Sequence, residues 1–116
     1  MRVKKERLLI WCNQINRQVF NNKIDLSGLK FRNFTKDHQN PNARAWYYPA
    51  ANRIDLISKE HNDVFEIFHT IAHELIHVYQ RQLGFDYYHL NHGGKFFRYY
   101  KRKICDMYEI QFNKEF

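Results

Sequence analysis

Apolar residues recur at helical spacing in three stretches of the chain. The first stretch spans residues 5 to 20, where Arg7, Gln14 and Gln18 fall elsewhere on the helical wheel. Side chains three or four positions apart share one face of a helix, so we expect an inward-packing face formed by Leu8, Cys12, Ile15 and Val19. Asn21 and Asn22 are expected to end this helix.

The second helical stretch begins with a capping signal. Asp63 and Glu66 have the N-cap and third-position spacing of a capping box, in which each side chain satisfies a backbone amide. We expect this helix to run to about Leu83, with Gly84 as its stop, and to bury a stripe formed by Val64, Ile67, Phe68, Ile71, Leu75 and Val78. The third stretch, residues 94–112, predicts a last helix that buries Phe97, Tyr100, Ile104 and Tyr108.

Between the first two helices the pattern shortens to alternation. From Leu29 to Phe34 apolar residues alternate with polar ones, which is typical of a strand with one solvent-exposed face. A polar loop from Lys36 to Asn42 follows, and then two further strand-like runs, Arg44 to Tyr48 and Arg53 to Ile57. The connection of these two runs is long enough for a hairpin but not for a helix. We therefore predict a small antiparallel sheet and an α+β fold class.

Length and composition describe one globular unit. The 116 residues suit a single domain, and 44% hydrophobic with 27% charged residues argues against long disorder. Cys12 and Cys105 are the two cysteines, which excludes a disulfide scaffold and a C-terminal zinc ribbon and fits a reducing compartment. No apolar run approaches the roughly 18 residues of a membrane span, so we expect no membrane partner and a cytoplasmic, not secreted, protein.

The net charge of +7 is unevenly distributed along the chain. Residues 1–53 carry 11 basic and 3 acidic side chains, residues 54–92 carry 2 and 6, and residues 93–116 carry 6 and 3. The middle is therefore acidic and its flanks are basic. A basic excess suggests a polyanionic partner such as nucleic acid.

The acidic middle contains His73, Glu74 and His77 in the pattern H-E-x-x-H. Histidines four apart on a helix lie on one face, so both imidazoles can bind one zinc ion while Glu74 lies beside the open coordination position. Zinc lowers the pKa of its bound water, and we expect Glu74 to take the proton as the water attacks a carbonyl. The alternative is a helix with two ordinary histidines.

A catalytic zinc ion needs a third protein ligand, for which the downstream candidates are His89, His92 and Glu109. The metzincin continuation is excluded, because Gln80 and Leu83 occupy the positions where it needs glycine and histidine. Glu109 fits a thermolysin-like arrangement and ranks second. His92 is our choice, because the glycines at 93 and 94 let the backbone bring a side chain close to the metal.

The segment His73-Glu74-Leu75-Ile76-His77-Val78-Tyr79, followed by His92-Gly93-Gly94-Lys95-Phe96, resembles the SprT-like (Spartan-type) zinc metalloproteases. Their third ligand is the histidine of a downstream His-Gly-x-x-Phe motif. Residues 43–48 and 53–58 are also similar to the hairpin that precedes the zinc helix in that family. The resemblance covers residues from about 5 to 112.

The resemblance implies a minimal zincin fold, one catalytic Zn²⁺ held by His73, His77 and His92, and Glu74 as general base. It also implies peptide-bond hydrolysis coupled to DNA, because relatives such as Spartan digest proteins crosslinked to DNA. The chain departs from the pattern in lacking the cysteine ribbon of bacterial SprT and the targeting tails of Spartan. That departure weakens the DNA-repair role more than the zinc chemistry.

A basic stripe follows the second zinc motif. Lys95, Arg98 and Arg102 lie at i, i+3 and i+7 of the last predicted helix, with Lys101 and Lys103 alongside. These residues are candidates for binding single-stranded DNA or DNA crosslinked to protein. The alternative is the solvated face of an amphipathic helix.

Three aromatic residues and one histidine each have two interpretations. Trp46 and Tyr48 either border the active site, where zincins align substrate by strand addition, or lie in the core. Tyr99 is expected in the core, with base stacking as the alternative. His69 shares the ligand face one turn before His73, and we expect it on the polar surface, with a supporting position behind the metal ligands as the alternative.

The sequence as a whole predicts a monomeric zinc endopeptidase that acts on DNA-associated proteins and lies in the cytoplasm, nucleoid or nucleus. The alternative is a zincin-shaped module that binds DNA or protein and hydrolyses little or nothing.

Overall fold

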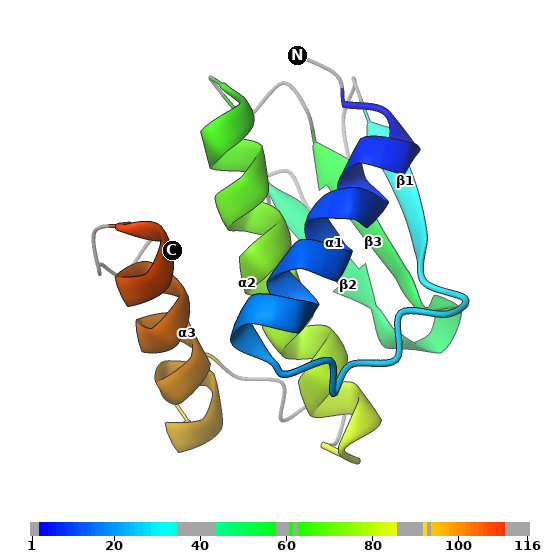
Figure 1. The fold of residues 1–116 in the computed structure, drawn as a ribbon. Helices are drawn as coiled ribbons and strands as arrows, with labels where there is room; N and C mark the ends of the chain where they lie inside the picture. Colours follow the sequence, from blue (N-terminus) through cyan, green and yellow to red (C-terminus); the bar gives the residue numbers. More distant parts are fainter. Residues whose placement is uncertain are drawn as a thin grey trace.

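The computed structural model describes residues 3–34, 44–57, 61, 63–85, 92 and 94–110. Within them the fold is α+β, with three helices and one three-stranded sheet (Figure 1). In chain order the elements are α1 (Lys5–Val19), β1 (Lys30–Phe34), β2 (Ala45–Tyr48), η1 (Pro49–Ala51), β3 (Arg53–Ile57), α2 (Val64–Gln82) and α3 (Lys95–Tyr108).

Helix α1 has the buried face that its spacing predicts, because Leu8, Cys12, Ile15 and Val19 are fully buried. The helix ends at Val19, and the two asparagines that were expected to end it follow its C-cap residue, Phe20. Asn21 and Asn22 adopt positive φ angles of 54° and 61°, which asparagine tolerates better than most residues. The backbone N–H of Asn22 donates to the carbonyl of Asn16 at 2.9 Å and closes the helix end.

The sheet has the strand order β1-β3-β2, so β3 is central. Strands β2 and β3 form the predicted hairpin, joined by a single turn of 3₁₀ helix, and they run antiparallel. Strand β1, however, pairs with β3 in parallel, with Phe31 opposite Ile54. The prediction of an antiparallel sheet was therefore wrong for β1, and the sheet is mixed. Alternation identifies the two faces of a strand but not the direction of its neighbour, and the hairpin leaves one edge of β3 for β1.

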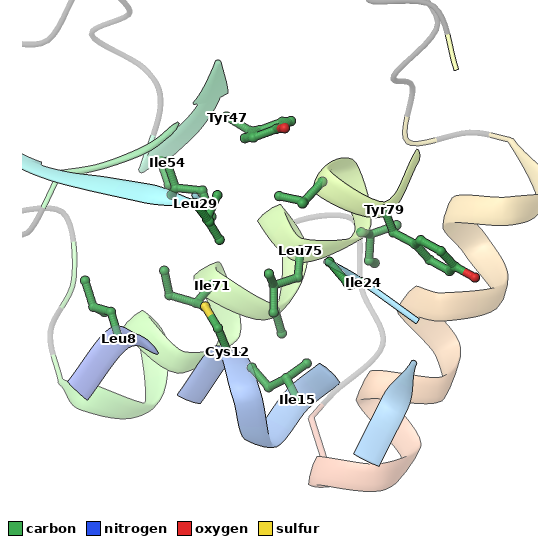
Figure 2. Close-up of a cluster of buried hydrophobic side chains, with 14 of the residues drawn as sticks. Leu8, Cys12, Ile15, Ile24, Leu29, Tyr47, Ile54, Ile71, Leu75 and Tyr79 are labelled. Carbon is green, nitrogen blue, oxygen red and sulfur yellow. The ribbon is translucent and has the colours of Figure 1, made fainter. Parts of the chain in front are cut away.

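One face of the sheet packs against α1 and α2, and the core lies between these layers (Figures 1 and 2). Figure 2 shows Ile54 of β3 on the sheet side of the core and Ile71 and Leu75 of α2 on the helix side. Helix α3 lies beside α2 and contacts both α2 and α1. Helix α2 is thus covered on several sides, as its broad apolar stripe predicts.

Capping residues determine where α2 begins and where α3 ends. Asp63 caps α2 by accepting a hydrogen bond from the backbone N–H of Glu66 at 3.0 Å. Val64 was predicted to join the buried stripe, but it is 46% exposed as the first residue of the helix. Helix α3 ends at Tyr108, not at residue 112, because Glu109 turns into the left-handed region with φ of 58°. The N–H groups of Glu109 and Ile110 both donate to the carbonyl of Cys105 there.

None of the described helices has the length and apolar character that crossing a membrane requires.

Candidate metal centre

Helix α2 places His73 and His77 one turn apart on the same face, with ring centroids 5.1 Å apart. The middle of this helix is buried between the sheet and α3, so His77 is only 7% exposed and Glu74 only 6%. His73 is half-buried. The H-E-x-x-H segment therefore lies on a rigid, well-packed part of the fold.

His92 comes from the chain just before α3 and meets both histidines of α2. Its Nε2 atom lies 3.0 Å from Nε2 of His73 and 3.1 Å from Nε2 of His77. One nitrogen from each of the three residues lies within 4.8 Å of the others. Among the described residues this is the one such group of histidine, cysteine or carboxylate side chains. The structure thus brings together the three residues that the sequence nominates as ligands.

The donor set fits a zinc ion. Zinc prefers imidazole nitrogens at about 2.0–2.1 Å in tetrahedral geometry, which places two such nitrogens about 3.3 Å apart. Nε2 of His92 lies 3.0 and 3.1 Å from those of His73 and His77, which is close to this value. His92 is exposed, so the ring at the outer side of the cluster borders solvent. Three protein ligands with one side toward solvent are typical of a catalytic rather than a closed structural site.

Phe97 of α3 holds the three imidazoles from one side. Its ring centroid lies 5.1 Å from that of His73, 5.2 Å from that of His77 and 4.9 Å from that of His92. Phe97 is itself 1% exposed. The docking of α3 therefore excludes water from this side of the cluster and restricts the rotation of the rings.

The Glu74 carboxylate lies beside the cluster, with Oε1 4.0 Å from Nε2 of His73. Burial raises the pKa of Glu74 to about 8, and a hydrogen bond from the backbone N–H of Tyr47 acts in the opposite direction. This bond places the β2 strand next to the carboxylate. Along an antiparallel strand, the backbone N–H groups point alternately toward the partner strand and away from it. The N–H of Ile57 donates to the carbonyl of Arg44, so Arg44 faces β3. Tyr47 lies three positions later, and its N–H therefore points to the outer edge of the sheet.

Burial acts on the histidines in the opposite sense, because their charged form is the protonated one. Burial lowers the pKa of His77 to about 4. The hydrogen bond to Gln80 acts in the opposite direction, and the charge of His92 lowers the pKa by a smaller amount. The pKa of His92 is also lowered, first by desolvation of the part of its ring that is covered and then by the charge of Lys101. Neutral imidazoles at neutral pH leave a nitrogen lone pair for a metal.

The other candidates for ligation differ in position. Glu109 is exposed in the left-handed residue after α3 and does not belong to the histidine group. His89 lies outside the described residues. His69 is half-buried on α2 and also outside the group, although it lies one turn before His73.

The two glycines after His92 were expected to let the backbone bring its side chain close to the metal. Gly94 is the N-cap of α3 with an ordinary φ of −74°, so the conformational freedom expected of this glycine is not used. Gly93 lies outside the described residues.

The five basic residues of α3 occupy three different positions on the helix. Lys95, Arg98 and Arg102 are exposed, and their helical positions place them opposite the face that carries Phe97. Lys101 follows Phe97 by one turn and lies on the same face, close enough for its charge to affect His92. Lys103, by contrast, caps α1 by donating to the carbonyl of Val19 at 2.6 Å. The exposed stripe therefore points away from the histidines and does not border them.

The aromatic predictions have mixed outcomes. Tyr99 was expected in the core but is 61% exposed, on the same side of α3 as the stripe. Trp46 is 36% exposed, and Tyr48 is half-buried with the Arg53 guanidinium 5.1 Å from its ring centre. Both therefore lie at the margin of the core.

Sequence reasoning missed two residues that contact the site, Gln80 and Tyr47. Gln80 carried a signal, because it is a polar residue three positions after a ligand, in a stretch of α2 that is otherwise apolar and buried. Tyr47 carried none, because its contribution is a backbone N–H whose direction depends on strand pairing.

Comparison with protein-family models, with curated proteins and with solved structures gives no match. The site is therefore interpreted from its own geometry.

Proposed function

We propose that this chain is a zinc-dependent endopeptidase of the SprT-like kind, acting on proteins associated with DNA. The observation that carries the proposal is the convergence of His73, His77 and His92 through their Nε2 atoms, next to the buried carboxylate of Glu74. A purely structural metal site would not need a carboxylate beside its ligands.

In this proposal His73, His77 and His92 hold the ion. Bound zinc would supply a Lewis acid that acidifies water and polarises a carbonyl group. Glu74 accepts the proton of the attacking water. This role needs the charged carboxylate, which burial alone disfavours and which a bound divalent cation would favour. The Tyr47 N–H holds the carboxylate in place for that transfer.

The substrate peptide is proposed to lie along β2. The outer edge of this strand borders Glu74, and an edge strand can pair with an extended peptide through its backbone groups. This arrangement would bring a scissile carbonyl close to the carboxylate and the histidines. Association with DNA is assigned to Lys95, Arg98 and Arg102, with the exposed ring of Tyr99 available for base stacking.

The experiment compares the wild type with Glu74→Gln on a DNA-binding protein substrate, with and without single-stranded DNA and with and without a chelator. Glutamine has nearly the same shape as glutamate but cannot accept a proton at neutral pH. We expect cleavage by the wild type alone, faster with DNA and abolished by chelator. Zinc content should be the same in both proteins.

Equal cleavage by both proteins would contradict the enzyme proposal and favour a binding module. Cleavage that depends on Glu74 but not on DNA would retain the protease and remove its coupling to DNA.

A further inference from the structure

Gln80 is a buried polar residue in the core-facing part of α2. It is 2% exposed and ranks among the largest fully buried side chains of the described part of the chain. Its Oε1 atom lies 2.8 Å from Nδ1 of His77. Burying an amide is unfavourable unless hydrogen bonds replace those it makes with water. The contact with His77 replaces one of these hydrogen bonds and so offsets part of the cost of burying Gln80.

The contact determines which nitrogen of His77 carries the proton. An amide oxygen can only accept, so Nδ1 must be the protonated nitrogen of the neutral ring. The lone pair then lies on Nε2, the atom that is 3.1 Å from Nε2 of His92. The opposite tautomer would place a hydrogen on Nε2 and block ligation.

The orientation of the ring is fixed by the same bond. Gln80 follows His77 by three positions on one helix, so the two side chains lie on neighbouring positions of a rigid element.

We propose that Gln80 is a positioning residue for a metal centre: by accepting from Nδ1 of His77, it presents Nε2 to a divalent cation that prefers nitrogen ligands. The proposal rests on the proposed zinc site for its cation but not for the tautomer, which exists in the metal-free protein. A residue that only packs the core would serve as well if it were apolar, since a buried methionine of similar length has no amide to satisfy.

The test uses Gln80→Met, which keeps the approximate shape and removes the strong acceptor, and Gln80→Glu, which keeps an acceptor oxygen. The first measurement is the ¹⁵N chemical shift pattern of His77 in the metal-free proteins, which distinguishes the two tautomers. We expect the Nδ1–H form in the wild type and in Gln80→Glu, and a mixture or the opposite form in Gln80→Met.

The second measurement is zinc affinity by competition with a chromophoric chelator. Loss of the group that orients a ligand typically lowers metal affinity by about ten- to a hundredfold, so we expect that loss in Gln80→Met and its rescue in Gln80→Glu. His77→Ala, which removes the ligand itself, is the reference for complete loss. Folding of each variant is checked by circular dichroism.

A wild-type ring in the Nε2–H form would overturn the proposal without any variant. Wild-type zinc affinity in Gln80→Met, or equal losses in Gln80→Met and Gln80→Glu, would also overturn it. If the wild type binds no zinc, the proposed function fails, while the tautomer measurement still decides the role of Gln80.

Discussion

Burial shifts the pKa values of Glu74 and His77, two residues of α2, in opposite directions. It raises the pKa of the Glu74 carboxyl to about 8 and lowers the pKa of His77 to about 4, because in each case it disfavours the charged form. Without a cation, both side chains are therefore neutral near pH 7. A divalent cation would reverse this preference at Glu74 by favouring its charged form.

The first prediction concerns the stability of the metal-free protein. Glu74 keeps its proton in the folded state up to about pH 8, whereas the unfolded chain releases it near the ordinary value of 4.5. Between these two pH values the folded state holds more protons than the unfolded state. The contribution of Glu74 to the free energy of unfolding is therefore fully present below about pH 4.5 and is lost as the pH rises through about 8. In urea unfolding at a series of pH values, the wild type should lose stability relative to Glu74→Gln by up to about 1.4 kcal/mol per pH unit in this window.

The comparison with Glu74→Gln controls for the other titrating groups, His77 included. These groups are the same in both proteins, so their contributions cancel in the difference between the two free energies of unfolding. Parallel stability curves for the two proteins would show that the pKa of Glu74 is not raised.

The residues of the zinc motif could be predicted from spacing alone, since His73 and His77 must share a helix face once the helix forms. The burial of Glu74 could not. It depends on how β2, from a different part of the chain, packs beside α2, where the backbone N–H of Tyr47 meets the carboxylate.

At the scale of the elements, α3 serves two purposes on two faces. One face carries Phe97 and Ile104 into the core and contacts the histidines. The opposite face carries Lys95, Arg98 and Arg102 into solvent. The spacing of the basic residues predicts this stripe, but not its direction relative to the histidines, because that direction follows from the way α3 docks on α2.

The second prediction is that the stripe binds single-stranded DNA. Replacing Lys95, Arg98 and Arg102 by alanine should weaken binding and reduce the slope of log affinity against log salt by about 2, since each phosphate contact on a single strand contributes about 0.7. Fluorescence anisotropy over a salt series measures the slope. Zinc content should not change, because these side chains point away from the histidines.

A matched control removes the same number of charges elsewhere. Lys4, Lys5 and Arg7 are exposed near the start of α1, and their replacement by alanine should leave the slope nearly unchanged. Equal effects of the two triple variants would mean that net charge, and not the stripe, determines binding.

The helices could be predicted more fully than the sheet. A helix forms its hydrogen bonds within itself, so the apolar spacing and the Asp63 cap suffice to locate α2. A strand depends on a partner distant in sequence, so alternation predicted β1 without its parallel pairing to β3. The end of α3 at Tyr108 depends on the left-handed conformation of Glu109, for which the sequence carries no strong signal.

At the scale of the whole molecule, the fold brings together three segments that bear the site. Helix α2 supplies His73, Glu74 and His77, the chain before α3 supplies His92, and β2 supplies the N–H that contacts Glu74. The buried ring of Phe97 joins the first two segments. The choice of His92 over Glu109 agrees with this geometry, because His92 lies at the histidine pair and Glu109 does not.

The central claim is that three histidines form a zinc site with a position left for water. X-ray absorption at the zinc K-edge, on protein loaded with one equivalent of zinc, reports the number and kind of ligands directly. We predict three imidazole nitrogens at about 2.0–2.1 Å and one further light-atom ligand. Two imidazoles with a carboxylate and water, sulfur at about 2.3 Å, or a failure to bind zinc stoichiometrically would contradict the account.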